Sequence, residues 1–308
     1  MSRTLGLALV VVAGCGNTSP ATLVDPGPPP TNGLQIILPI VRDLEAGSDN
    51  ELCTWTNVIA DKDLAVRAVQ AFQSVTGHHV VVYKTKSYQP AGTTRKCSDD
   101  DLTTVRFVAG AGGEGVAMRN EAPGNIVFSI EAGYQIVVNE HFLNATLQKH
   151  DAQSAVNLYY ADPGSSFIKS AAMAIVDTSL DLPPGKPTKD IDCTLQNDIK
   201  AWFSIPHMHH WGANITVDHV PVDTGVSERL FDTDWTPEYT FHPPEMRLDP
   251  AAPKWFHKGD HVKVRCTWNN DTGHSLGFGP EMCVFFAQTV DDVNLGNLAC
   301  DGGQWSGF

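Results

Sequence analysis

The sequence predicts an all-β protein built from two β-sandwich domains. Its 308 residues include 26 glycines and 20 prolines, and only 18% of them are charged, which favours turns over helical bundles. Short runs rich in β-branched and aromatic residues recur along the chain at strand length. The segment Leu-Pro-Pro-Gly-Lys-Pro at residues 182–187 divides these runs into two sets. Two sets of short strands with one break between them are typical of two packed sandwiches.

The expected strands follow from these apolar runs. They are residues 34–40, 75–83, 125–130, 134–138, 156–160, 171–176, 199–205, 213–217, 262–268 and 282–288. Helical periodicity occurs only at residues 63–72, where we expect a short helix. The glycine-rich segment 110–115 is expected to be a loop, and it lacks the Lys-Ser/Thr ending of a phosphate-binding loop.

The first fifteen residues have the features of a bacterial lipoprotein signal. Arg3 supplies a positive charge, and the apolar stretch at 5–12 is too short to span a bilayer. Val-Ala-Gly-Cys at 12–15 looks like a lipobox, which makes Cys15 the lipidated residue. An ordinary secretory signal with an incidental cysteine is the alternative. We therefore expect an exported protein held by a lipid anchor in the bacterial cell envelope, at the outer membrane or cell surface.

A proline-rich tether is expected to follow Cys15, with the folded part beginning near Gly33. The expected organisation is therefore a signal and tether at 1–33, an N-terminal domain at 34–183 and a C-terminal domain at 184–308. The formal net charge of −14 argues against a nucleic-acid partner and against a polybasic membrane patch.

Cysteine usage also fits export. Six of the seven cysteines remain after Cys15, namely Cys53, Cys97, Cys193, Cys266, Cys283 and Cys300. An even number of cysteines in an exported chain indicates disulfides, and from the residues alone fifteen pairings are open.

Histidines are concentrated in three short segments. Six of the twelve are His78 and His79, His141, and the three in His-Met-His-His at 207–210. Residues two apart share one face of a strand, so His207 and His209 are expected to reach one metal ion. Adjacent His78 and His79 require a bulge or a strand end for the same purpose, and the preceding glycine permits one.

The choice of metal rests on a sulfur ligand. Imidazole binds copper, zinc, nickel and iron, whereas the soft thioether of Met282 favours copper. Met208 is expected to point away from the face that His207 and His209 share. His210 is expected to support the site from the opposite face or to lie in the core.

Five motifs, in order along the chain, resemble those of the copper type II, ascorbate-dependent monooxygenases. This is the family of the peptidylglycine α-hydroxylating and dopamine β-monooxygenases. The motifs are Thr-Gly-His-His-Val at 76–80, Asn-Glu-His-Phe-Leu-Asn at 139–144, the stretch 177–185, His-Met-His-His-Trp-Gly at 207–212 and Glu-Met-Cys at 281–283. Phe142 stands where the family usually has tyrosine.

The resemblance implies two antiparallel jelly-roll β-sandwich domains that each hold one copper. It implies that His78, His79 and His141 bind the electron-supplying copper, and that His207, His209 and Met282 bind the catalytic copper. It also implies three disulfides, which are Cys53–Cys97, Cys193–Cys300 and Cys266–Cys283. The implied reaction is hydroxylation of a C–H bond in an unknown small organic substrate by O2, with ascorbate or another reductant supplying electrons.

The chain departs from the peptide-amidating members of the family. Ile205, Val284 and Phe286 occupy the positions from which those enzymes bind the peptide carboxylate. This departure argues against peptide amidation, and we expect these three residues to line a more apolar substrate pocket.

Three other readings compete with the monooxygenase. A non-catalytic copper-binding or storage lipoprotein at the cell surface would use the same ligands. A zinc hydrolase fits the His-Met-His spacing but leaves Met282 unexplained, and the sequence holds no His-Glu-x-x-His motif. A metal-free β-sandwich surface protein treats the whole ordered set as chance.

Overall fold

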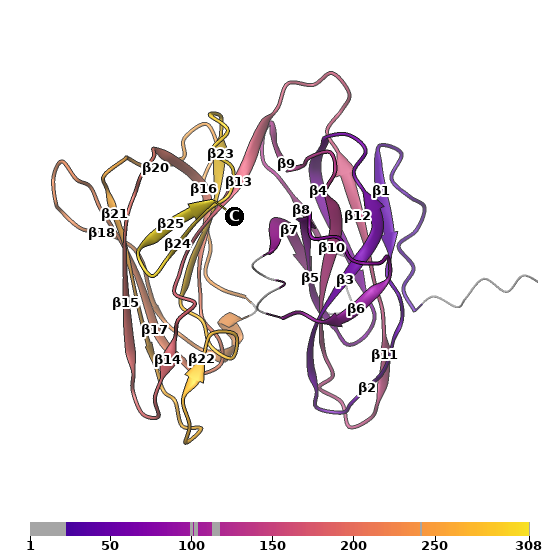
Figure 1. Cartoon of the computed structure of the whole chain (residues 1–308), viewed down its shortest axis with the longest axis horizontal. Coiled ribbons are helices and arrows are strands. Elements are labelled where there is room, and N and C mark those ends of the chain that lie inside the picture. The colour runs from indigo at the N-terminus through magenta and orange to yellow at the C-terminus, as the bar shows by residue number, and fades with distance from the viewer. Residues whose placement is uncertain (1–22, 99–100, 102–103, 113–117, 241, 308) are drawn as a thin grey trace, which may run out of the picture.

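Two β-sandwiches lie side by side in the protein (Figure 1). The computed structural model describes residues 23–98, 101, 104–112, 118–240 and 242–307, so Cys15 and the predicted signal lie outside them. The predicted all-β class, with two antiparallel jelly-roll β-sandwiches, is confirmed. Among the described residues, no helix is long and apolar enough to cross a membrane.

The first sandwich is formed by two sheets. One has the strand order β6-β3-β10-β5-β7, and the other begins β1-β12-β4-β9, with β8 paired to β4. The strands are β1 (Gly33–Ile37), β2 (Val41–Leu44), β3 (Asp49–Ile59), β4 (Leu64–Gln73), β5 (Gly77–Thr85), β6 (Thr93–Lys96), β7 (Val105–Gly112), β8 (Met118–Glu121), β9 (Ile126–Ile130), β10 (Gln135–Leu143), β11 (His150–Ala152) and β12 (Ser154–Tyr160).

The second sandwich packs β13, β23 and β16 against the sheet β15-β21-β17-β18. Its elements are β13 (Ile168–Val176), β14 (Asp181–Leu182), β15 (Thr188–Thr194), β16 (Ile199–His207), β17 (Gly212–Val220), β18 (Glu228–Asp234), the 3-10 helix η1 (Pro237–Thr240), β19 (Met246–Arg247), β20 (Lys254–Phe256), β21 (His261–Trp268), β22 (Leu276–Gly277), β23 (Val284–Asp291), β24 (Leu298–Asp301) and β25 (Gln304–Gly307).

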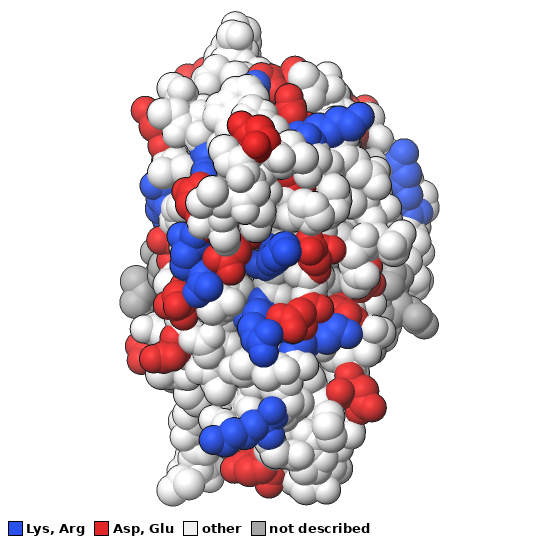
Figure 2. Space-filling model, turned by 90° about the vertical axis from the view of Figure 1, so that its left-hand side faces the viewer, with Lys and Arg blue, Asp and Glu red and all other residues white. Residues whose placement is uncertain are grey.

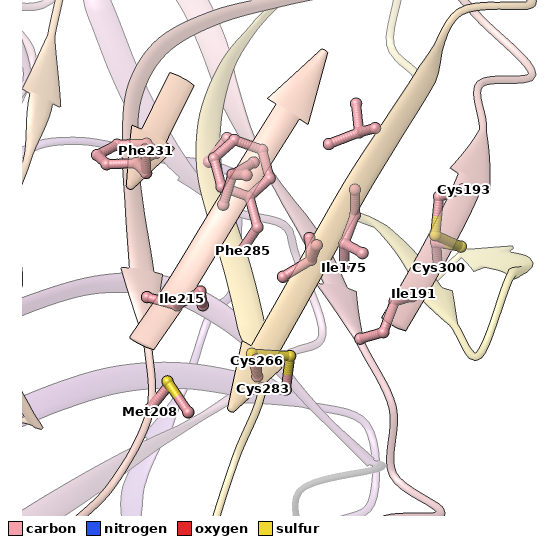
Figure 3. Close-up of a cluster of buried hydrophobic side chains, with 14 of the residues drawn as sticks. Ile175, Ile191, Cys193, Met208, Ile215, Phe231, Cys266, Cys283, Phe285 and Cys300 are labelled. Carbon is pink, nitrogen blue, oxygen red and sulfur yellow. A yellow bond between two sulfur atoms is a disulfide. The ribbon is translucent and has the colours of Figure 1, made fainter. Parts of the chain in front are cut away.

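Each sandwich buries its own hydrophobic core. In the second core, Ile175 and Phe285 from one sheet lie near Ile215 and Phe231 from the other (Figure 3). Two disulfides lie within this core, Cys193–Cys300 and Cys266–Cys283, and Cys53–Cys97 lies in the first sandwich. All three implied pairings are therefore confirmed.

The two halves are joined by a continuous sheet. β13 pairs antiparallel with β23 over residues 169–176 and parallel with β9 over residues 168–170. The indole of Trp202, in the second half, belongs to the first core, and Phe203 and Val290 pack against that core. The predicted division between residues 183 and 184 falls after β13.

Most predicted strands coincide with observed ones, but the predicted helix at 63–72 is wrong. This segment is β4, where buried and partly exposed residues largely alternate, and it pairs with β12, β8 and β9. Its short apolar run fits the residue period of a helix as well as that of a strand, and the hydrogen bonds of the sheet select the strand. The predicted loop at 110–115 is wrong for residues 110–112, which end β7, and residues 113–115 lie outside the described part.

The chain packs earlier than the expected start near Gly33. The N–H of Leu23 donates to Oε1 of Gln153 at 2.7 Å, and Val24 is only 7% exposed. The first strand nevertheless begins at Gly33, so the proline-rich segment lies on the folded body rather than wholly outside it.

The outer face of the sheet β15-β21-β17-β18 is covered by paired charges. Figure 2 shows acidic and basic side chains interspersed on this side of the molecule. The ion pairs are Arg265–Asp190, Lys263–Asp192, Arg229–Asp218, Arg229–Asp232 and Lys254–Glu228. This face is therefore a charged, solvated face.

Candidate metal centres

The structure brings His78, His79 and His141 together. His78 and His79 are the second and third residues of β5, and His141 lies on β10 directly opposite His79. The three rings are mutual neighbours, with centroids 4.8–5.2 Å apart. One nitrogen from each ring lies within 4.8 Å of the others, a spacing that suits one metal ion. We refer to these residues as the first cluster.

A strand end lets two adjacent histidines face the same point. β5 begins at Gly77, and the pairing of β10 with β5 shifts register between His141 and Phe142. The Nδ1 atoms of His78 and His79 are 2.9 Å apart as a result. The irregularity predicted for this pair is therefore present.

Asp49 orients the third ring of the first cluster. Its Oδ1 lies 2.6 Å from Nε2 of His141. Since an ionised carboxylate only accepts, Nε2 carries the proton and Nδ1 has the lone pair that a metal needs. The hydrogen bond to His141 is the main cause that lowers the pKa of Asp49. Sequence reasoning missed Asp49, because 92 residues separate it from His141.

Two further residues pack closely around the first cluster. A Cβ on Gly112 would lie 2.4 Å from the Cβ of His79, so only glycine fits there. Nε2 of Gln73 donates to the backbone carbonyls of His79 at 3.2 Å and His141 at 3.3 Å. The backbone beneath both rings is therefore held by β4 and β7.

Burial keeps His79 and His207 neutral. Desolvation lowers the pKa of His79 to about 3, and His141, His78 and His207 lower it further. Desolvation also lowers the pKa of His207 to about 3, with His209 as the second cause. Neutral imidazole is the form that coordinates metals, so both rings are in the ligand state at neutral pH.

His207 and His209 form the second cluster, with ring centroids 5.0 Å apart. The predicted reason for their proximity is wrong, because β16 ends at His207 and His209 lies in the following loop. Met208 is buried in the core (Figure 3), whereas the prediction was only that it points away from His207 and His209. His210 is exposed, which corrects the expectation that it supports the site or lies in the core. A tight turn at the strand end, rather than a shared strand face, brings the two rings together.

Two contacts fix the His209 ring and backbone. Nε1 of Trp235 donates to the backbone carbonyl of His209 at 3.0 Å. Nδ1 of His209 lies 3.3 Å from the carbonyl oxygen of Pro280, which only accepts. Nδ1 therefore carries the proton, and Nε2 of His209 has the lone pair.

Met282 is anchored beside this loop. The backbone N–H groups of Met282 and His209 both donate to Oε2 of Glu281, at 3.3 and 3.1 Å. The next residue, Cys283, is bonded to Cys266 on β21. The structure thus ties the predicted sulfur ligand to the same anchor as a predicted imidazole ligand.

A histidine of the second half lies beside the first cluster. The ring of His242, just after η1, lies 5.9 Å from the ring of His78, centroid to centroid. His207 is among the groups that lower the pKa of His79, and His209 is among those that lower the pKa of Asp49. His207 and His209 therefore lie close enough to the first cluster to affect these two pKa values.

The three predicted pocket residues lie near His207 on one sheet face. His207 is opposite Val284, and Ile205 is opposite Phe286, on the adjacent strands β16 and β23. The ring of Phe286 contacts Phe107 of the first half at 5.0 Å between centroids. Apolar side chains therefore continue from His207 to the interface.

No protein-family model matches the chain, and no curated protein matches it. Among solved structures, the major capsid protein P2 of bacteriophage PM2 is similar at 8% identity and a TM-score of 0.39, covering 86% of this chain and 99% of that one. A broad bean stain virus structure has 7% identity and a TM-score of 0.30, covering 93% and 94%. The PBSX exported protein XepA has 11% identity and a TM-score of 0.25, covering 87% and 94%.

Proposed function

We propose that the protein is a copper-dependent monooxygenase that hydroxylates a C–H bond of a small organic substrate with O2 and a reductant such as ascorbate. The observation that carries this proposal is the presence of two histidine clusters, three imidazoles at His78, His79 and His141 and two at His207 and His209. The loop of His209 and the backbone of Met282 share the carboxylate of Glu281. The motif resemblance described above agrees with this ligand set.

The donors fit copper at both centres. The first cluster offers three nitrogen ligands from His78, His79 and His141, whose nitrogen atoms lie within 4.8 Å of one another. The second offers His207 and His209, and Met282 would add a soft sulfur ligand. When bound, copper would supply electron storage and the activation of O2.

The protein's own contribution is positioning and exclusion of water. Asp49 and the carbonyl of Pro280 set the tautomers of His141 and His209. Ile205 and Val284 flank the position of His207 with apolar side chains. A substrate with an apolar carbon next to the second centre suits this environment.

Metal content and oxygen consumption test the proposal. We expect the folded part, loaded with copper and washed, to hold two coppers, and the His207→Ala/His209→Ala variant to hold one. The His257→Ala/His261→Ala variant removes two histidines outside both clusters and should still hold two. Met282→Leu should abolish reductant-dependent O2 consumption in a substrate screen.

Three results would contradict the proposal. Zinc retained in place of copper, or no tightly bound metal, would exclude the monooxygenase. Two coppers without reductant-driven O2 use across the screen would favour the non-catalytic copper-binding lipoprotein.

A further inference from the structure

Glu281 is a fully buried carboxylate at the second cluster. It lies between Pro280 and Met282, just before β23, and is 0% exposed. Removing a carboxylate from water is costly, so its burial requires several good hydrogen-bond donors.

Four N–H groups donate to the Glu281 carboxylate. Oε1 accepts the backbone N–H of Trp211 at 2.7 Å. Oε2 accepts the backbone N–H of His209 at 3.1 Å and the indole Nε1–H of Trp268 at 2.8 Å. Oε2 also accepts the N–H of Met282, at 3.3 Å. Hydrogen bonds to an ionised acceptor are the stronger class, and together these hold the carboxylate in one orientation.

These donors belong to three separate segments. His209 and Trp211 lie in the loop after β16, at sequence separations of 72 and 70 from Glu281. Trp268 ends β21 on the opposite sheet and is 1% exposed. Glu281 therefore connects the loop of His209 to the backbone of Met282. Through Trp268 it also connects both segments to the core.

We propose that Glu281 is the positioning residue of the second metal centre. Its carboxylate sets the loop of His209 against Met282, so that the imidazole and the thioether can face one ion. This inference rests on the proposed function and deepens it. Glu281 itself is assigned no metal contact, because its buried oxygens already accept four N–H groups.

Asp260 provides a matched control in the same half. It is 1% exposed and, like Glu281, accepts several N–H groups: Nε2 of His219 at 2.7 Å, the backbone N–H of Val222 at 2.9 Å and that of His257 at 2.7 Å. Asp260 precedes β21, whereas Trp268, the indole donor to Glu281, ends it, so roughly 25 Å of strand separate Asp260 from Trp268. Asp260→Asn therefore perturbs an equivalent buried group without touching the metal centre.

The test compares the wild type with Glu281→Gln and Asp260→Asn. In metal-free protein, amide hydrogen exchange is measured for residues 208–212. We expect Glu281→Gln to accelerate exchange of this segment by about tenfold or more, because the glutamine amide presents N–H groups to other donors. Asp260→Asn should leave the segment unchanged. In copper-loaded protein, X-ray absorption should show sulfur scattering in the wild type and Asp260→Asn but not in Glu281→Gln.

The outcomes separate the two proposals. Unchanged exchange in Glu281→Gln, or equal acceleration in both variants, would overturn the positioning role. If the wild type binds no copper, the proposed function is wrong. Amide hydrogen exchange in the metal-free protein would still decide whether Glu281 holds the loop. If Glu281→Gln does not fold, Trp268→Phe removes one donor and keeps an aromatic ring. This variant should accelerate hydrogen exchange of residues 208–212 to a smaller extent. Unchanged exchange would overturn the positioning role of Glu281.

Discussion

Asp49 and His141 form a 2.6 Å contact between Oδ1 and Nε2 at the edge of the first histidine cluster. Such a carboxylate partner selects which imidazole nitrogen carries the proton, and so which one is a ligand. The contact therefore connects Asp49, the first residue of β3, to the histidine that β10 contributes to the cluster.

Asp49→Asn should weaken copper binding at the first cluster by about 10- to 100-fold, because the ring of His141 loses its charged acceptor. Competition against a copper chelator measures this change. Asp192→Asn removes a similar contact, with Nδ1 of His261 at 2.7 Å, outside both clusters and should have no effect. Equal affinities in all three proteins would contradict the assigned role of Asp49.

Gly112→Ala should disrupt the first cluster, because the new Cβ would lie 2.4 Å from the Cβ of His79. Overpacking of this kind costs about 1–3 kcal/mol of unfolding free energy, and it should also release the first copper. Gly110→Ala, on the same strand, is the matched control, since its nearest contact would be an ordinary 3.5 Å to the carbonyl oxygen of Val80. Urea unfolding and metal content are the measurements, and similar behaviour of both variants would argue against the steric explanation.

Glu140→Gln should remove a pH dependence of stability. Burial raises the pKa of Glu140 to about 7, while Thr54 and Ser154 oppose this rise through hydrogen bonds. The unfolded carboxyl ionises from about pH 4.5, so the wild type loses stability as pH rises from there to about 7. In metal-free protein, the unfolding free energy of the variant relative to the wild type should rise by about 1 kcal/mol per pH unit over this window. Above the window this difference should stay constant. Urea unfolding at several pH values checks the slope. The exposed Glu245→Gln should show no such gain, and a flat difference for Glu140→Gln would contradict its raised pKa.

Removing each of two disulfides should distinguish an effect on stability from an effect on metal binding. Replacing Cys266 and Cys283 by alanine opens a link over 17 residues and should cost about 3 kcal/mol. It should also weaken the second copper, because Met282 precedes Cys283. Replacing Cys193 and Cys300 opens a link over 107 residues and should cost about 5 kcal/mol without weakening copper. Melting temperatures and chelator competition give the two readouts, and copper loss that follows stability alone would exclude a specific role for Cys266–Cys283.

The sequence predicted those features that follow from local patterns or from the motif resemblance. Strands with clear apolar runs, the three disulfides and the assembly of His78, His79 and His141 belong to this group. The helix predicted at residues 63–72 is wrong, because a short apolar run fits a strand and a helix alike and the neighbouring strands of the sheet decide between them.

The supporting residues of the site could not be predicted in the same way. Asp49, Trp235 and Glu281 act through hydrogen bonds to residues 92, 26 and 72 positions away. Such contacts have no characteristic spacing, and polar residues of these types are common at strand ends. The position of His209 was predicted from strand periodicity, whereas a turn after the strand end produces it.

The burial of Trp202 in the first core has a practical consequence for dividing the chain. A fragment ending at residue 183 would contain β13 without its partner β23 and would lack the indole that completes its own core. The other fragment would expose that indole to water. We therefore expect the two fragments to be less stable apart than joined in one chain, because separation exposes apolar surface of both.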